Sequence, residues 1–180
     1  TPASYGASFT VGGKWTIGAS GVFLPYCEAN NGAIPVLMAK ALYIDAAGEI
    51  NASGKGYKYG PGYYAASRGA SYGGIGGGNY VGKAAYGSAD EPVDPGSGDC
   101  YQSHGGGVVH LTVENKAEIY GSILADAKDV STISPDYIPF NSGASGGSVN
   151  LRIYKLIGGE AARISALGGG ANGATGYNLG

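Results

Sequence analysis

Two stretches of the chain repeat each other in register, and this repeat constrains the fold more than any other feature. Residues 105–113 read Gly-Gly-Gly-Val-Val-His-Leu-Thr-Val, and residues 145–153 read Ser-Gly-Gly-Ser-Val-Asn-Leu-Arg-Ile. At a constant offset of 40, the matched apolar residues are Val109 with Val149, Leu111 with Leu151, and Val113 with Ile153. Apolar and polar residues alternate, as they do in a strand with one buried face. The repeat therefore predicts two equivalent strands whose apolar faces stack.

A shorter second strand follows each of these runs. Ile123 matches Ile164 at an offset of 41, which predicts one inserted residue between the two strands. In the same two strands, Ala125 matches Ala166. An earlier copy of the short strand has Ile50 and Ala52 in the equivalent positions, and the run before that copy has Leu42 and Ile44 as its inward pair. Repeats of this length indicate stacked supersecondary units, each too small to bury its own apolar face.

The N-terminal segment fits the same plan, with short β-type runs at 8–11, 14–17 and 21–24 separated by Gly and Ser. No segment has the spacing of an amphipathic helix. We therefore expect an all-β protein, a right-handed parallel β-helix or solenoid. It would form a single domain over residues 1–180, as part of a longer chain or an assembly. An antiparallel sheet, β-sandwich or jelly roll is the alternative, because turn-separated strands of this length occur there too.

Residues 53–104 interrupt the repeat with a segment rich in glycine and tyrosine. Its tyrosines are Tyr57, Tyr59, Tyr63, Tyr64, Tyr72, Tyr80, Tyr86 and Tyr101. Long loops without structure are uncommon in compact domains, so we expect these rings to pack on the wall of the solenoid, on a neighbouring molecule or on a glycan. The run 73–79 is mostly glycine and could lie close against other backbone.

Composition excludes several classes of protein. The chain has 36 glycines without a Gly-x-y period, which excludes collagen. It is 43% apolar and only 13% charged, the opposite of a disordered chain. The 11 Lys and Arg are scattered and the net charge is −2, so we expect no nucleic acid partner. No apolar run is long enough for insertion into a membrane.

The motifs together resemble a known class of repeat. They are Gly48-Glu-Ile-Asn-Ala-Ser-Gly, the Gly/Tyr insert with Ala85-Tyr-Gly-Ser, Asp94-Pro-Gly-Ser-Gly, the two Gly-Gly-led strands, and Ile164-Ser-Ala-Leu-Gly-Gly-Gly-Ala. The segment from about 32 to 171 resembles the glycine-rich parallel β-helix segments, of pectin-lyase-like or adhesin type, found in large secreted or cell-surface proteins of protists and bacteria. Asp126-Ala127 departs from the pattern, where a glycine is expected. The resemblance implies an extracellular or cell-surface location and a role in surface fibres.

Two kinds of covalent modification are predicted. An even number of cysteines in such a chain fits one disulfide, between Cys27 and Cys100, in an oxidising compartment. Two buried free thiols are the alternative. Asn51 begins the sequence Asn-Ala-Ser and would point outward between the inward Ile50 and Ala52, as glycosylation requires.

Candidate metal sites are weak. The acidic run contains Asp90, Glu91, Asp94 and Asp99, whose oxygens suit calcium. The run lacks a known calcium-loop spacing, and a solvated turn is the simpler interpretation. His104, His110 and Cys100 do not have a familiar zinc spacing, and His110 is expected to face solvent from its strand. We expect no metal and no cofactor.

These features together favour an extracellular structural protein over an enzyme. It would be a self-associating fibre, filament or adhesin-stalk element whose partners are copies of itself or adjacent segments of a larger surface protein, and a polysaccharide in addition. The first alternative is a carbohydrate-binding surface module. The second is a polysaccharide lyase or hydrolase, which would need two outward carboxylates, or a carboxylate with Arg152 or Lys155, around one sugar.

Overall fold

The computed structural model describes residues 5–64, 69–77, 82–99, 103–128 and 143–170, and these residues contain strands and no helix. Its four long strands are β1 (Tyr5–Ile17), β3 (Ile34–Ile44), β5 (Val108–Ile119) and β7 (Ser148–Gly158). Its four short strands are β2 (Val22–Phe23), β4 (Glu49–Asn51), β6 (Ser122–Leu124) and β8 (Arg163–Ser165). The long strands form one sheet in the order β1-β3-β5-β7, and the short strands form a second in the order β2-β4-β6-β8.

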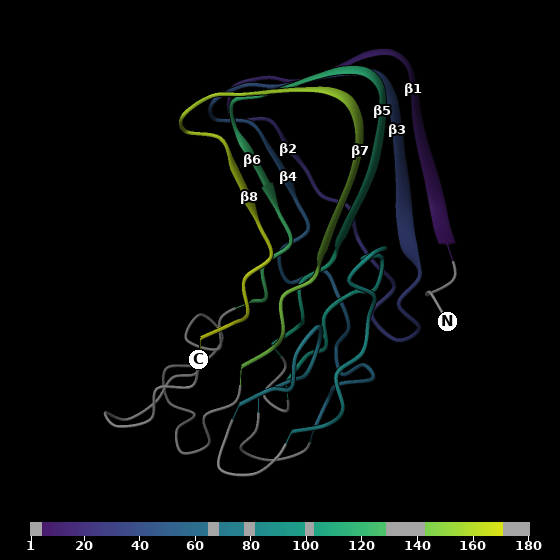
Figure 1. The fold of residues 1–180 in the computed structure, drawn as a ribbon, viewed down its shortest axis with the longest axis vertical. Coiled ribbons are helices and arrows are strands. Elements are labelled where there is room, and N and C mark those ends of the chain that lie inside the picture. The colour runs from purple at the N-terminus through teal and green to yellow at the C-terminus, as the bar shows by residue number, and fades with distance from the viewer. Residues whose placement is uncertain (1–4, 65–68, 78–81, 100–102, 129–142, 171–180) are drawn as a thin grey trace.

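Each long strand turns over into the short strand that follows it, and four such units lie side by side (Figure 1). We call these units rungs 1 to 4, from β1–β2 to β7–β8. Every pairing between neighbouring strands is parallel, which excludes an antiparallel sandwich for these strands. The all-β, parallel character expected from the repeat is confirmed.

The register between rungs 3 and 4 is the one that the repeat predicts. Val109 pairs with Val149, Leu111 with Leu151, Val113 with Ile153 and Ile123 with Ile164. The net insertion of one residue has two components. A register shift after Val113 removes one residue from β7, so that Lys116 pairs with Lys155, and the turn 159–162 is two residues longer than 120–121. Similar shifts occur in rungs 1 and 2, between Val11 and Lys14 and between Ala39 and Leu42, and bulges of this kind bend strands.

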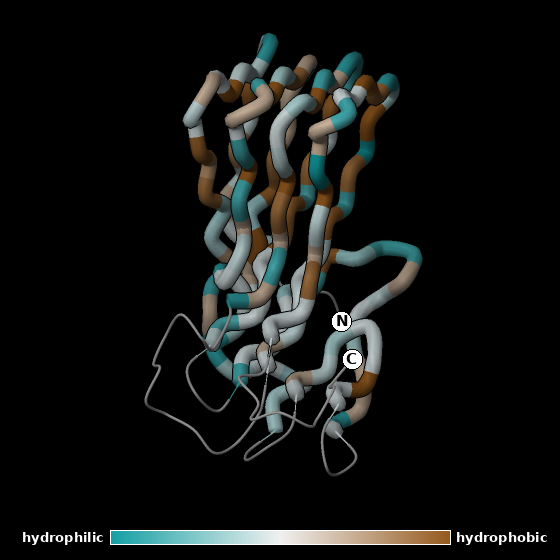
Figure 2. Tube along the Cα trace, turned by 90° about the vertical axis from the view of Figure 1, so that its left-hand side faces the viewer, coloured by the Kyte–Doolittle hydropathy of each residue, from teal (hydrophilic) through white to brown (hydrophobic). Residues whose placement is uncertain are grey.

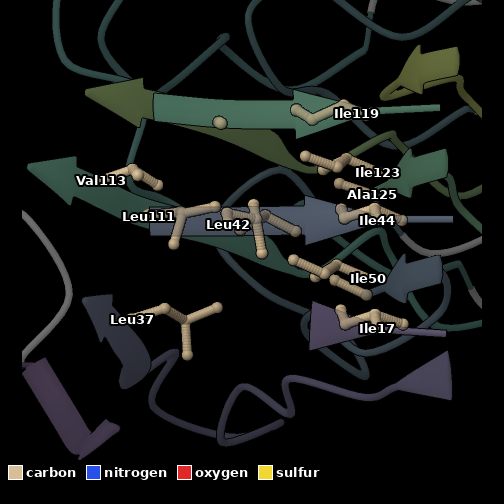
Figure 3. Packing of buried hydrophobic residues seen from close by; sticks show 13 residues of the cluster. Ile17, Leu37, Leu42, Ile44, Ile50, Leu111, Val113, Ile119, Ile123 and Ala125 are labelled. Carbon is tan, nitrogen blue, oxygen red and sulfur yellow. The ribbon is translucent and has the colours of Figure 1, made fainter. Parts of the chain in front are cut away.

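The core lies between the two sheets and consists of apolar ladders that run across the rungs. Figure 3 shows labelled side chains from both sheets directed into the space between them. The ladders are Phe9-Leu37-Leu111-Leu151, Val11-Ala39-Val113-Ile153, Trp15-Leu42-Ala117-Leu156 and Phe23-Ile50-Ile123-Ile164. In rungs 2 and 3 these residues are almost fully buried, and each large side chain contributes about 1.5–3 kcal/mol by leaving water.

Glycine-rich segments fill the end of the molecule opposite the strand bends. Figure 2 shows apolar residues concentrated on the strands and paler segments beyond them. Segments 55–59, 95–99, 103–107 and 143–147 are joined by direct backbone hydrogen bonds, among them Gly56 N to Gly105 O at 2.8 Å and Gly106 N to Ser145 O at 3.0 Å. We call these four segments the glycine layer. In the run 73–79, close backbone approach occurs at Gly76, beside Gly69, whereas Gly74 borders open space.

Candidate association surfaces at the two ends of the sheets

The apolar face of rung 4 is uncovered in the part of the chain that the structure describes. Ile123 of rung 3 is fully buried, but its partner Ile164 is 50% exposed. Leu156 is 53% exposed beside the fully buried Ala117. Leu151 and Ile153 are only partly buried. The next position along each ladder is therefore open, on the outer edge of β7 and β8.

Rung 1 ends the core differently, with three aromatic rings. Phe9, Trp15 and Phe23 lie with ring centroids 4.9–5.1 Å apart, inside the usual range for aromatic pairs. Large rings fill the end of the core at β1 and β2, the first strands of the two sheets among the described residues. We call this cluster the aromatic plug. The sequence held a signal for it, because Phe9, Phe23 and the only tryptophan all lie in the first 23 residues.

A groove runs beside the open rung. A pocket of about 590 Å³ lies between the insert and rung 4, lined by Tyr72 and Tyr86 on one side and by Ser148, Val149 and Ile164 on the other. The Tyr72 and Ser148 hydroxyls are hydrogen-bonded, and the Tyr86 hydroxyl donates to Pro95 O at 2.6 Å. Burial raises the pKa of both phenols above its usual value.

The other tyrosines of the insert divide between the interior and the surface. Tyr57 is buried, with its hydroxyl 3.4 Å from Asn31 O. Tyr59 and Tyr64 are exposed, and the ring of Tyr59 meets that of Tyr63 edge-on at 4.8 Å between centroids. Tyr80 and Tyr101 lie outside the described residues.

Asp126 has a structural role at the point where a glycine was expected. Its carboxylate accepts from the backbone N of Leu167 at 2.7 Å, contacts the Ser165 hydroxyl and lies 3.3 Å from the Arg163 guanidinium. These partners all belong to the segment around β8. A carboxylate at this position therefore holds rung 4 on rung 3.

The predicted modification sites are only partly described. Cys27 is buried and forms no disulfide with any residue that the structure describes, and burial raises the pKa of its thiol from 9.0 to about 11. Cys100 lies outside the described residues, so the disulfide stays a prediction. Asn51 is half-buried between the buried Ile50 and Ala52. Its amide donates to Glu49 at 3.0 Å and accepts from Ser53 N at 2.9 Å, and its glycosylation also stays a prediction.

The acidic run does not form a metal-binding cluster. Among the residues with described positions, no three His, Cys, Asp or Glu side chains lie close enough to hold a metal ion. Asp90 and Glu91 are exposed, Asp94 is half-buried, and Asp99 is buried and hydrogen-bonded by Ser103 N at 2.8 Å. Glu91 instead forms an exposed ion pair with Arg152 at 2.6 Å, and such pairs contribute about 0–1 kcal/mol.

The expectation that His110 faces solvent is wrong. Its side chain points away from the core, between the buried Val109 and Leu111, yet His110 is only 8% exposed. The Tyr5 ring lies 5.9 Å from it, and Val93 of the insert joins a second apolar cluster with Cys27, Ile34 and the adjacent Val108. Burial, followed by the charge of Arg152, lowers the pKa of His110 below its usual value.

No helix in the described part of the chain has the length and apolar character needed to cross a membrane. A comparison with protein-family models, with curated proteins and with solved structures finds no match to this chain.

Proposed function

We propose that the chain is an extracellular or cell-surface structural element, a right-handed β-solenoid that extends by adding the first rung of a second copy to its own last rung. The role is mechanical and non-enzymatic: a fibre, filament or stalk subunit. The observation that carries the proposal is the open rung 4. Its apolar residues continue ladders that are fully buried one rung earlier, and no strand in the described part of the chain continues those ladders beyond β7 and β8.

A second copy fits this edge because rung 1 has the same residue pattern and the same strand direction. Parallel addition would place Phe9 beside Leu151, Val11 beside Ile153 and Phe23 beside Ile164, and so continue each ladder. Unpaired edge strands are templates for such pairing. The contact joins two different surfaces, so it does not close on itself, and repeated addition gives an open filament.

The proposed location depends on the resemblance to glycine-rich β-helix segments of secreted and surface proteins. A disulfide between Cys27 and Cys100 and a glycan on Asn51 would agree with that location. Both are part of the proposal.

The proposal is tested by sedimentation velocity over a range of protein concentrations. We expect the chain to form head-to-tail oligomers, and Ile164→Lys to abolish them, because the added ammonium would be buried without a partner. Ile75→Lys is the matched control, since Ile75 is 61% exposed on the insert. Circular dichroism establishes that both variants are folded. A chain that stays monomeric at every concentration, or an Ile164→Lys variant that associates like the control, would overturn the proposal.

Salt provides an independent test of the register. Parallel addition in the ladder register brings Lys14 of one copy beside Lys155 of the other. Salt screens such like-charge contacts. Association should therefore strengthen as salt concentration rises, and Lys155→Gln should remove most of that dependence.

Exposed rings favour a second candidate function, a carbohydrate-binding surface. Tyr59 and Tyr64 are both exposed on the insert, where aromatic faces can stack on sugar rings. A glycan array tests this function. A signal that is lost in Tyr59→Ala and Tyr64→Ala would support it, and an array without signal would exclude it for the glycans presented.

A further inference from the structure

A pocket of about 490 Å³ lies where the segments that follow β2, β4 and β6 meet the end of the insert at His104. Its charged and titratable lining residues are Tyr26, Cys27, Lys55, His104 and Lys128. No carboxylate is among the lining residues that the structure describes. This is an unusual concentration of positive charge in a chain whose net charge is −2.

The pocket is built from four segments, around Cys27, Lys55, His104 and Lys128, that backbone hydrogen bonds hold together. Cys27 N donates to Lys55 O at 3.1 Å, Gly54 N donates to Asp126 O at 2.9 Å, and Lys128 N donates to His104 O at 3.2 Å. Gly54 has a φ of +63°, a left-handed conformation that turns the chain beneath Lys128. Backbone hydrogen bonds therefore fix the positions of Lys55 and Lys128 on different segments of the pocket wall.

The cationic groups in and around the pocket have few anionic neighbours. The Lys55 ammonium lies 4.3 Å from the centroid of the Tyr26 ring, a cation–π contact that holds it at the rim. Glu28 and Asp126 are the nearest acidic residues along these segments. The Glu28 carboxylate accepts from the backbone N of Asn30 and of Asn31. The Asp126 carboxylate faces Arg163, Ser165 and Leu167. The positive charge of the pocket is therefore not neutralised by a carboxylate in its wall.

We propose that this pocket binds one oxyanionic group, a phosphate, sulfate or carboxylate, paired with Lys55 and Lys128 and hydrogen-bonded by His104. Ammonium groups pair with such anions as point charges, and hydrogen bonds between charged groups are about twice as strong as neutral ones. The site does not depend on the proposed association, because rung 4 contributes no residue to its lining.

His104 couples this binding to pH. Burial, then Lys58, Lys128 and Lys55, lowers the pKa of His104 below its usual value in the free protein. The other titratable groups in the wall are the Tyr26 phenol and the Cys27 thiol, whose pKa burial raises to about 11. A bound anion offsets the three ammonium groups and raises the pKa of His104. Binding should therefore take up a proton, and affinity should increase as pH falls towards the lowered pKa of His104 in the free protein.

The experiment follows the imidazole NMR signals of the two histidines during pH titrations. The probes are sodium sulfate and sodium phosphate, with sodium chloride at matched ionic strength as the reference. We expect each oxyanion to raise the pKa of His104 and to leave that of His110 unchanged, which makes His110 an internal control. The double variant Lys55→Gln/Lys128→Gln should lose the effect, whereas Lys40→Gln, which changes an exposed lysine of β3, should keep it.

Two further arms distinguish a free anion from an anionic sugar. Acetate presents the carboxylate alone, and trigalacturonate presents it on a sugar ring. Tighter binding of trigalacturonate than acetate assigns the anion to a glycan, and a response to sulfate or phosphate alone assigns it to a free ion. An unchanged His104 pKa with all four probes, or an equal response in the double variant, would overturn the site. Sedimentation of the double variant should match that of the unmodified chain, which separates this proposal from the association.

Discussion

The close approach of backbones in the glycine layer gives the sharpest prediction about stability, for the substitution Gly106→Ala. A methyl group at Gly106 would lie 2.8 Å from the carbonyl carbon of Ala125 and closer still to its oxygen, and would also meet the backbone N of Gly147. Side-chain Cβ atoms essentially never come this close to backbone. Ala125 directly follows β6 of rung 3 and Gly147 directly precedes β7 of rung 4, so the methyl group must displace the backbone at the ends of both rungs.

The expected cost can be worked from these contacts. Overpacking in a well-packed region costs about 1–3 kcal/mol, and backbone atoms cannot relieve it by changing rotamer. The displacement also strains the bonds from Gly147 N to Ala125 O at 2.8 Å and from Gly106 N to Ser145 O at 3.0 Å. Each buried polar group that loses its hydrogen bond lowers the free energy of unfolding by about 1–3 kcal/mol more. Alanine also restricts the unfolded chain more than glycine does, which offsets the loss by about 0.4–1 kcal/mol. The free energy of unfolding should fall by at least about 2 kcal/mol.

Urea denaturation followed by far-UV circular dichroism and by Trp15 fluorescence measures this change. For a chain of this size a loss of about 2 kcal/mol lowers Tm by roughly 4–8 °C. Gly74→Ala is the matched control, because nothing lies within 4 Å of the added methyl group, and it should be neutral or slightly stabilising. If Gly106→Ala unfolds at the same urea concentration as Gly74→Ala, the backbone contacts assigned to the glycine layer do not exist.

Three further predictions concern the core, the insert and the buried thiol. Leu111→Ala should lower the free energy of unfolding by about 2–5 kcal/mol, because Leu111 is fully buried. Leu151→Ala should lower it by clearly less, because Leu151 lies in the open rung 4 and is only partly buried. Equal losses in urea titrations of monomeric protein would contradict this burial pattern. Tyr86→Phe removes the hydroxyl that bonds to Pro95 O and Ser97 Oγ and should cost about 1–3 kcal/mol in the same assay, whereas no loss would mean that water replaces these bonds. Burial raises the pKa of Cys27 from 9.0 to about 11, so the thiol of the reduced protein should resist Ellman's reagent at pH 8. The folded state should also lose stability as pH rises from 9 towards 11, because in this range the thiol ionises in the unfolded chain and stays protonated in the folded one. Cys27→Ala should remove that part of the alkaline loss, and rapid labelling of the native protein would show the thiol to be accessible.

The strand pairing could be predicted from the sequence because its signal is local. Alternation along each strand identifies the buried face, and the shared offset identifies the partner, as for Val109 with Val149. Compared with β5–β6, the pair β7–β8 is one residue shorter at the bulge and two residues longer in the turn. The sequence could not reveal these two changes separately, because the offset between the repeats reports only their sum.

Features that depend on distant segments were beyond the sequence. His110 occupies an outward position of its strand, but it is buried, with the Tyr5 ring 5.9 Å away. Glycines have no side chains whose pattern could reveal which backbones meet. The pocket that contains Lys55, His104 and Lys128 is assembled from residues far apart in the chain, so no spacing identifies it.

The connections between rungs have an engineering consequence. They span 24–33, 52–107 and 125–147, yet each delivers the chain to a strand in parallel register with the previous one. The entropy of closing a loop grows only slowly with its length. A foreign peptide spliced into an exposed stretch of the longest connection should therefore leave the sheets unchanged. A polymer of such subunits would then present that peptide at regular intervals along one flank, which makes the fold a scaffold for periodic display.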